Sequence, residues 1–212
     1  MAKKRGQKKD ASKMGQVRII GGDWRGRKLP VLSSDGLRPT SDRVRETLFN
    51  WLQFEIAGAN CLDVFAGSGA LGLEALSRGA KATTFLELSV PAVKQLQANL
   101  ATLKANNAQV IQGDSLQWLE SRSDKGGAEN FDVIFMDPPF HQGLMQKTVD
   151  KLFITGIVSS EQSERPAWLY LEQEKELAWP RLPEGWRCYR EKTTSQVRFG
   201  LFKIEKPLEV LS

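Results

Sequence analysis

One segment constrains the fold of this chain more than any other: a glycine-rich stretch that directly follows a short apolar strand. The segment Asp63-Val-Phe-Ala-Gly67-Ser-Gly69-Ala-Leu-Gly72 has three glycines in G-x-G-x-x-G spacing. It joins a predicted strand at 61–66 to a predicted helix at 70–77. Such a unit is typical of the first strand, turn and helix of a nucleotide-binding α/β sheet. A tight turn that holds no ligand has the same pattern.

Predicted strands and helices alternate after this segment. Further strands are expected at 82–88, 108–114, 131–137 and 168–172, and helices at 90–103, 115–120 and 144–153. This alternation predicts a Rossmann-like α/β fold with a mostly parallel sheet that is covered on both faces. The last two predicted strands, 185–192 and 196–205, flank a three-residue loop and predict a C-terminal antiparallel hairpin.

Bulk properties exclude several classes of protein. The 212 residues contain no apolar run long enough to span a bilayer. Cys61 and Cys188 have neither metal-ligand spacing nor a disulfide framework, so we expect a cytoplasmic protein. His141 is the only histidine, and no metal site is predicted.

Positive charge is concentrated at the N-terminus. Residues 1–50 hold 13 Lys or Arg and 5 Asp or Glu, a net charge of +8, whereas the other 162 residues carry −3. Such a basic arm favours a polyanionic partner, although a solvated tail has the same composition. We predict a basic disordered tail at 1–14, a small β-hairpin and a helix at 15–55 that bind this partner, and an α/β domain at 56–212.

Three acidic residues stand at the ends of successive predicted strands. Asp63, Glu87 and Asp114 follow strands one, two and three, where ligands of open α/β sheets bind. Glu87 has the position of an acid that binds ribose hydroxyls, and Asp114 either accepts from an adenine amino group or caps the next helix. A carboxylate at Asp63 would repel a pyrophosphate and attract a cation, which favours S-adenosylmethionine over a dinucleotide.

The tetrapeptide Asp137-Pro138-Pro139-Phe140 at the end of the fourth predicted strand indicates the reaction type. An exocyclic amine of a base becomes nucleophilic when acceptors hold its two hydrogens, and these acceptors also stabilise the positive charge that develops on nitrogen. The Asp137 carboxylate and the Pro138 carbonyl supply two acceptors, and Phe140 supplies a face on which a base can stack. A simple strand-terminating turn with a buried Phe has the same residues. His141 is expected to be a loop residue rather than a general base.

These motifs together resemble the bacterial ribosomal RNA small subunit methyltransferase D family of class I S-adenosylmethionine-dependent methyltransferases. The resemblance runs from Arg18 to about Lys203, and its most specific segment is RPTSDRVRETLFNWL at 38–52. It implies a seven-stranded sheet and methylation of the N2 amine of one guanosine in 16S rRNA, in a small-subunit ribosomal particle. The domain at 56–212 would then be the methyltransferase domain, and the segment 15–55 would bind the RNA. A monomer is expected, with no membrane and no metal.

The expected site residues fall into three groups. The proposed catalytic residues are Asp137, Pro138, Pro139 and Phe140. The proposed S-adenosylmethionine-binding residues are Asp63, Phe65, Gly67, Ser68, Gly69, Glu87, Leu88, Asp114 and Ser115. The proposed RNA-binding residues are Arg18, Arg25, Arg27, Lys28, Arg38, Arg43 and Arg45, of which Arg43 and Arg45 lie on a helix that also has the option of facing the cofactor.

Three other functions share part of this pattern. An adenine-N6 DNA methyltransferase would use the same mechanism. An NAD-dependent oxidoreductase would have the same glycine spacing, but Asp63 and the Asp137–Phe140 loop argue against it. A non-catalytic RNA-binding protein on a Rossmann-like scaffold would have the same basic N-terminus.

Overall fold

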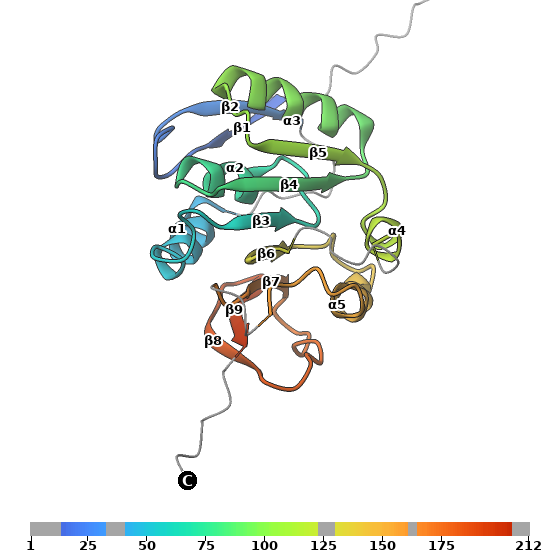
Figure 1. The fold of residues 1–212 in the computed structure, drawn as a ribbon. Coiled ribbons are helices and arrows are strands. Elements are labelled where there is room, and N and C mark those ends of the chain that lie inside the picture. The colour runs from blue at the N-terminus through green and yellow to red at the C-terminus, as the bar shows by residue number, and fades with distance from the viewer. Residues whose placement is uncertain (1–13, 33–40, 123–129, 161–164, 205–212) are drawn as a thin grey trace, which may run out of the picture.

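A computed structural model describes residues 14–32, 41–122, 130–160 and 165–204 of the chain (Figure 1). Its elements are, in chain order, β1 (Met14–Arg18), β2 (Lys28–Leu32), α1 (Asp42–Trp51), β3 (Asn60–Asp63), α2 (Ala70–Ser77), β4 (Ala82–Glu87), α3 (Val90–Leu103), β5 (Ala108–Gln112), α4 (Ser115–Glu120), β6 (Val133–Met136), α5 (Leu144–Ile154), β7 (Trp168–Glu174), β8 (Trp186–Thr193) and β9 (Val197–Ile204). The predicted tail at 1–14 and the predicted site residue Arg38 lie outside the described residues, apart from the backbone of Met14.

Seven strands form the central sheet in the order β5-β4-β3-β6-β7-β9-β8. The pairs from β5 to β7 are parallel, and β9 pairs antiparallel with both β7 and β8. The predicted α/β fold with a C-terminal antiparallel hairpin is therefore confirmed, as is the separate two-stranded N-terminal hairpin of β1 and β2.

The strand order reverses at β3, which has β4 on one side and β6 on the other. The glycine-rich segment follows β3, and the Asp137-Pro138-Pro139-Phe140 tetrapeptide follows β6. Because β3 and β6 are paired, the two segments are neighbours at the carboxyl edge of the sheet. A reversal of this kind opens the crevice in which α/β sheets bind ligands.

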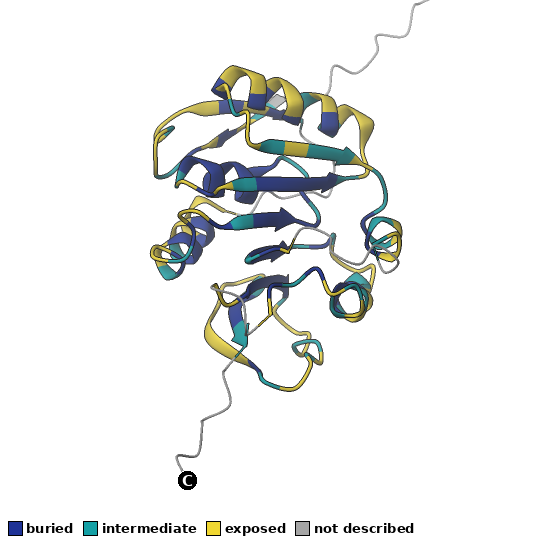
Figure 2. Cartoon of the chain, viewed as in Figure 1, coloured by how far each residue is buried: buried dark blue, intermediate teal, exposed yellow. Residues whose placement is uncertain are grey.

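Helices cover both faces of the sheet, as the buried residues show (Figure 2). Helices α1 and α2 pack with Cys61, Phe135 and Tyr170 on one face, and α4 and α5 pack with Leu62 and Ile134 on the other. The outer strand β8 is exposed along most of its length. In the described part of the chain, no helix combines the length and the apolar character that a membrane span requires.

The N-terminal hairpin contacts the rest of the molecule through the connection between its strands, residues 19–27. Within it, the N–H of Asp23 and the N–H of Trp24 donate to the backbone carbonyl and the hydroxyl of Ser77 in α2. The Asn99 amide of α3 also donates to the Pro30 carbonyl at 2.9 Å. These contacts with α2 and α3 hold the hairpin against the sheet domain.

Candidate functional site

The glycine loop between β3 and α2 has two residues in the left-handed region, Gly67 (φ +52°) and Gly69 (φ +75°). A Cβ on Gly69 would lie 2.4 Å from Leu96, and a Cβ on Gly72 would lie 2.2 Å from the Phe85 ring. These two glycines therefore allow close packing inside the protein. A Cβ on Gly67 would meet only the Phe65 carbonyl, at 3.9 Å, so open space lies above Gly67. Of Gly67 and Gly69, the two glycines that we expected to bind the cofactor, Gly67 has open space above its backbone.

Glu87 connects this loop to the end of β4. Its Oε2 accepts from the N–H of Gly67 at 2.7 Å, and its Oε1 accepts from the N–H of Ser89 at 2.7 Å. The adjacent Leu88 side chain is 65% exposed, and Ser68 is half-buried. The arrangement holds a carboxylate and an apolar side chain at the crevice beside the open space of Gly67.

Asp63 is buried beneath the loop. Its Oδ2 accepts from the N–H of Gly72 at 3.1 Å, and only 3% of the residue is exposed. Burial raises the pKa of Asp63 to about 7, against the opposing effect of the Gly72 bond, and the nearby Glu87 raises it further. The expected contact between Asp63 and the ammonium group of S-adenosylmethionine stays a prediction.

Asp114 and Ser115 hold the start of α4. Asp114 is the N-cap of this helix and accepts from the N–H of Gln117 at 2.9 Å, which is one of the two roles that we considered for it. The Ser115 hydroxyl donates to the Val64 carbonyl at 2.5 Å and so joins α4 to the end of β3. The adenine contact of Asp114 stays a prediction.

The Asp137–Phe140 loop lines a cavity of about 620 Å³. Its walls come from α1, from the loop after β6, from β7 and from the β8–β9 turn. The lining residues are Ser41, Arg43, Val44, Thr47, Asp137, Pro138, Pro139, Phe140, Glu172, Lys192, Thr193, Thr194, Ser195, Gln196, Val197 and Phe199. Phe140 is 37% exposed and forms part of the wall rather than of the core.

Sequence reasoning missed Glu172 and the β8–β9 turn as parts of this cavity. Glu172 is 5% exposed, and its Oε2 accepts from the Tyr170 hydroxyl at 2.6 Å. Burial raises the pKa of Glu172 to about 7, although the Tyr170 hydrogen bond lowers it. The sequence did contain a signal for Glu172. It is an acid at the end of the otherwise apolar predicted strand 168–172, a position equivalent to those of Asp63 and Glu87 on their strands.

His141 lies just outside the cavity, in a left-handed conformation with φ +62°. Its backbone N–H donates to Glu174 Oε1 at 2.7 Å, and its Nδ1 lies 3.4 Å from the same oxygen. The His141 side chain is 87% exposed. His141 is therefore an exposed loop residue. Among the described residues, no three His, Cys, Asp or Glu side chains are grouped as a metal site requires.

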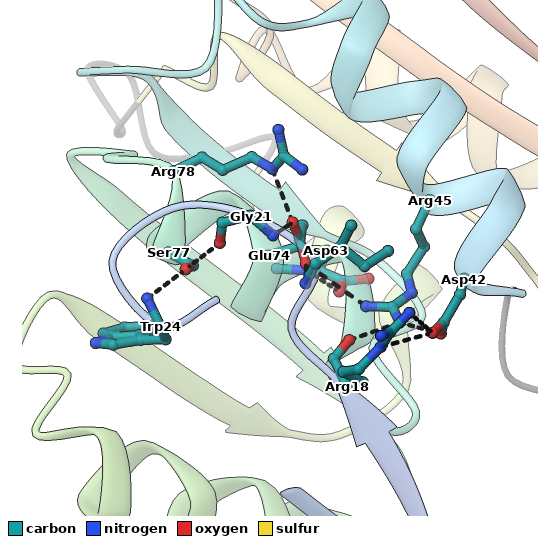
Figure 3. Close-up of polar contacts among 11 residues, drawn as sticks. Arg18, Gly21, Trp24, Asp42, Arg45, Asp63, Glu74, Ser77 and Arg78 are labelled. Atoms are coloured by element: carbon teal, nitrogen blue, oxygen red, sulfur yellow. Dashed lines mark hydrogen bonds and ion pairs between the residues drawn. The ribbon is translucent and has the colours of Figure 1, made fainter. Parts of the chain in front are cut away.

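The prediction that Arg45 binds RNA phosphate is wrong, because its side chain is fully buried (Figure 3). Arg45 Nη2 donates to the Arg18 carbonyl and to Asp42 Oδ1, and Nη1 lies 3.7 Å from Glu74 Oε2. The apolar side of α1 packs into the core, and Arg45 projects between α1, α2 and the N-terminal hairpin. A side chain in this position has no access to a phosphate.

Glu74 is the acceptor at the centre of this network, and sequence reasoning missed it. Its side chain is fully buried and accepts from the backbone N–H groups of Ile20 and Gly21, both at 2.8 Å, and from Arg78 Nε at 2.7 Å. Figure 3 shows Glu74 between Gly21 of the hairpin and Arg78 at the end of α2. Glu74 therefore fastens the N-terminal hairpin to the sheet domain.

The other predicted RNA-binding residues in the described part of the chain are exposed. Arg25, Arg27 and Lys28 lie on the hairpin, and Arg43 lines the cavity. Arg18 is paired with Asp42 at 3.1 Å, and its side chain is 55% exposed. These five side chains are accessible to a polyanion, and their contact with RNA stays a prediction.

Comparison with known proteins gives extensive matches. The family described as conserved hypothetical protein 95 matches residues 17–203. Ribosomal RNA small subunit methyltransferase D of Escherichia coli (strain K12) is 49% identical over 199 residues, which cover 94% of this chain and 96% of that protein. The solved structure of yhhF from Escherichia coli has a TM-score of 0.80 and 46% identity and covers 90% of this chain and 99% of that chain. A more distant structure, SMU.776 complexed with SAH, shares the fold at 16% identity, with a TM-score of 0.68 over 96% of this chain and 58% of that chain.

Proposed function

This chain belongs to the ribosomal RNA small subunit methyltransferase D family, and from that membership we propose that it transfers a methyl group from S-adenosylmethionine to the N2 amine of a guanosine in 16S rRNA. One observation carries the proposal. The Asp137–Phe140 loop lines a cavity of about 620 Å³, and the strand before it is the sheet neighbour of the strand that leads into the glycine loop. The Asp137–Phe140 loop and the glycine loop thus leave neighbouring parallel strands at the same edge of the sheet.

The residues around the glycine loop fit S-adenosylmethionine. Open space above Gly67 lets the backbone approach a ligand, and Glu87 offers a carboxylate to ribose hydroxyls at the end of β4. Leu88 presents an exposed apolar side chain that is suited to one face of an adenine. Phe65, Ser68, Gly69, Asp114 and Ser115 complete the proposed site. The bound group would supply an electrophilic methyl on a sulfonium.

The base is held by the chain's own residues in the larger cavity. The Asp137 carboxylate and the Pro138 carbonyl accept the two hydrogens of the guanine amine, and Asp137 stabilises the positive charge that develops on nitrogen. Phe140, partly exposed in the wall, stacks on the base. The target nucleotide must be unstacked to enter, so an unpaired or extruded guanosine is the expected substrate.

Exposed basic residues supply the contact with the RNA backbone. Arg25, Arg27 and Lys28 on the hairpin and Arg43 at the cavity are placed on accessible surface, as phosphate contacts require. We assign this role to the segment 15–55 and propose a small-subunit particle as the substrate. Because the substrate is ribosomal, we also propose that the protein acts in the cytoplasm. We also propose that the protein acts as a monomer.

A methyl-transfer assay with radiolabelled S-adenosylmethionine tests this function. Label should enter 16S rRNA as N2-methylguanosine, and it should not enter DNA or protein. Calorimetry should show that S-adenosylhomocysteine binds and NAD does not. Incorporation of label into adenine of DNA would replace the proposed substrate, and tight binding of NAD without methyl transfer would refute the proposed reaction.

A further inference from the structure

Two carboxyl groups, rather than one, face the cavity in which the base is proposed to bind. Met136 and Leu171 are paired in the parallel register of β6 and β7, so the residues that follow them, Asp137 and Glu172, are neighbours at the edge of the sheet. Both residues line the cavity. The amine of guanine has two hydrogens, and Asp137 with the Pro138 carbonyl is enough to hold them. Glu172 has no part in that contact.

Glu172 is held in a defined position. The Tyr170 hydroxyl donates to its Oε2 at 2.6 Å, and Tyr170 is fully buried, with its ring 6.4 Å from that of Phe135. Phe199 of β9 is paired with Glu172 across the sheet. A carboxyl group with 5% exposure is poorly solvated, so hydrogen-bond donors from a ligand would stabilise its charged form.

Guanine offers the required donors. Its Watson–Crick edge has N1–H directly beside the N2 amine, whereas the N1 of adenine is an acceptor. When the amine of a base contacts Asp137, the adjacent N1 of that base therefore faces the neighbouring position in the cavity, which Glu172 occupies.

We propose that Glu172 accepts the N1–H of the target guanine and thereby selects guanine against bases that lack this hydrogen. The inference rests on the proposed function and adds the group that determines base specificity. Tyr170 is a positioning residue, because it acts through Glu172. An adenine in the same orientation would face the carboxylate with a lone pair, and the two acceptors would repel each other.

The test compares two bases and two variants. The RNA substrate carries either guanosine or 2-aminopurine riboside at the target position. 2-Aminopurine retains the N2 amine but has a lone pair in place of N1–H. The wild-type protein is expected to prefer guanosine in kcat/KM by about 10- to 100-fold, the range of one hydrogen bond to a charged group. Glu172→Gln should reduce this preference by about tenfold or more, because its amide can donate to the lone pair.

Glu174→Gln is the matched control. It makes the same substitution two residues further along β7, at a side chain that does not line the cavity, and its preference for guanosine should equal that of the wild type. If Glu172→Gln lowers kcat/KM equally for both bases, Glu172 has only a structural role and the proposal is overturned. If the wild type methylates no guanosine-containing rRNA, the proposed function has failed first, and the specificity role is rejected with it.

A second measurement needs no variant. Asp137, Tyr170, Arg43 and Lys192 are the ionisable groups that line the cavity or contact Glu172. Since burial raises the pKa of Glu172 to about 7, lower pH protonates it and turns it into a donor. The preference of the wild type for guanosine over 2-aminopurine should then fall as the pH decreases through 7. A preference that is independent of pH in this range would contradict the proposal even if Glu172→Gln does not fold.

Discussion

Replacing Glu74 by glutamine should destabilise the protein strongly, although the change is nearly isosteric and lies outside the cavity. The glutamate is fully buried and accepts three hydrogen bonds from Ile20, Gly21 and Arg78. It is also the buried counter-charge of Arg45, at 3.7 Å. Glutamine has one acceptor oxygen, and its NH₂ group would face a donor. At least one donor would lose its partner, and Arg45 would lose a buried counter-charge.

The magnitude follows from these contacts. A hydrogen bond to a charged group contributes about 1.5–3 kcal/mol, and removing one member of a buried ion pair costs about 3–5 kcal/mol. Because these effects overlap, we expect Glu74→Gln to lower the free energy of unfolding by about 3–5 kcal/mol. This is a large part of the 5–15 kcal/mol that is typical of a domain.

Urea unfolding of the whole chain, followed by circular dichroism, measures this loss. The matched control is Glu176→Gln, an exposed acid, which should change the free energy of unfolding by no more than about 0.5 kcal/mol. Arg45→Leu should also destabilise, and the double variant should lose less than the sum of the two single losses, because each single change leaves a buried partner behind. A loss below about 1 kcal/mol for Glu74→Gln would refute the idea that this network fastens the hairpin.

Three further predictions concern the site and the charge. Asp137→Ala should lower kcat by about 10²–10³ and leave the affinity for S-adenosylhomocysteine nearly unchanged, because its proposed contact is with the base. Kinetics and calorimetry on the same sample check this, and a collapse of cofactor affinity would contradict it. Alanine at Arg25, Arg27 and Lys28 together should weaken RNA binding and flatten its salt dependence by about one unit of slope per lost phosphate contact, without changing the methylated nucleotide. Filter binding at several salt concentrations measures this slope, and an unchanged slope would give the hairpin a purely structural role. Burial raises the pKa of Asp63 to about 7, above about 3.9 in an unfolded chain, so the folded form binds this proton more tightly. The resulting stabilisation is complete below about pH 4 and is lost as the pH rises through 7. Asp63→Asn cannot ionise, so its stability relative to the wild type should increase over this range in urea unfolding at several pH values.

The sequence by itself determined the elements of the fold and their order. The expected bounds of α2, α3 and α4 agree with the structure, and α3 and α4 begin where a local side-chain cap precedes them. Ser41, Ser89 and Asp114 cap their helices by accepting hydrogen bonds from the backbone N–H groups three residues on, a contact that neighbours along the chain make without help from the rest of the molecule. The two motifs also identified the edge of the sheet at which the site lies.

Only the tertiary structure decided which charged residues face the interior. Arg43 and Arg45 lie on the same helix, α1, and both were predicted to be accessible to RNA. Arg45 is buried against Glu74, whereas Arg43 lines the cavity. Glu74 accepts from residues more than 50 positions earlier, and Glu172 reaches the cavity because β7 is placed beside β6. The energy of a buried charge depends on partners that the fold brings together from distant parts of the chain. No local pattern of residue types contains that information, so the role of each of these side chains became visible only once the sheet and helices were assembled.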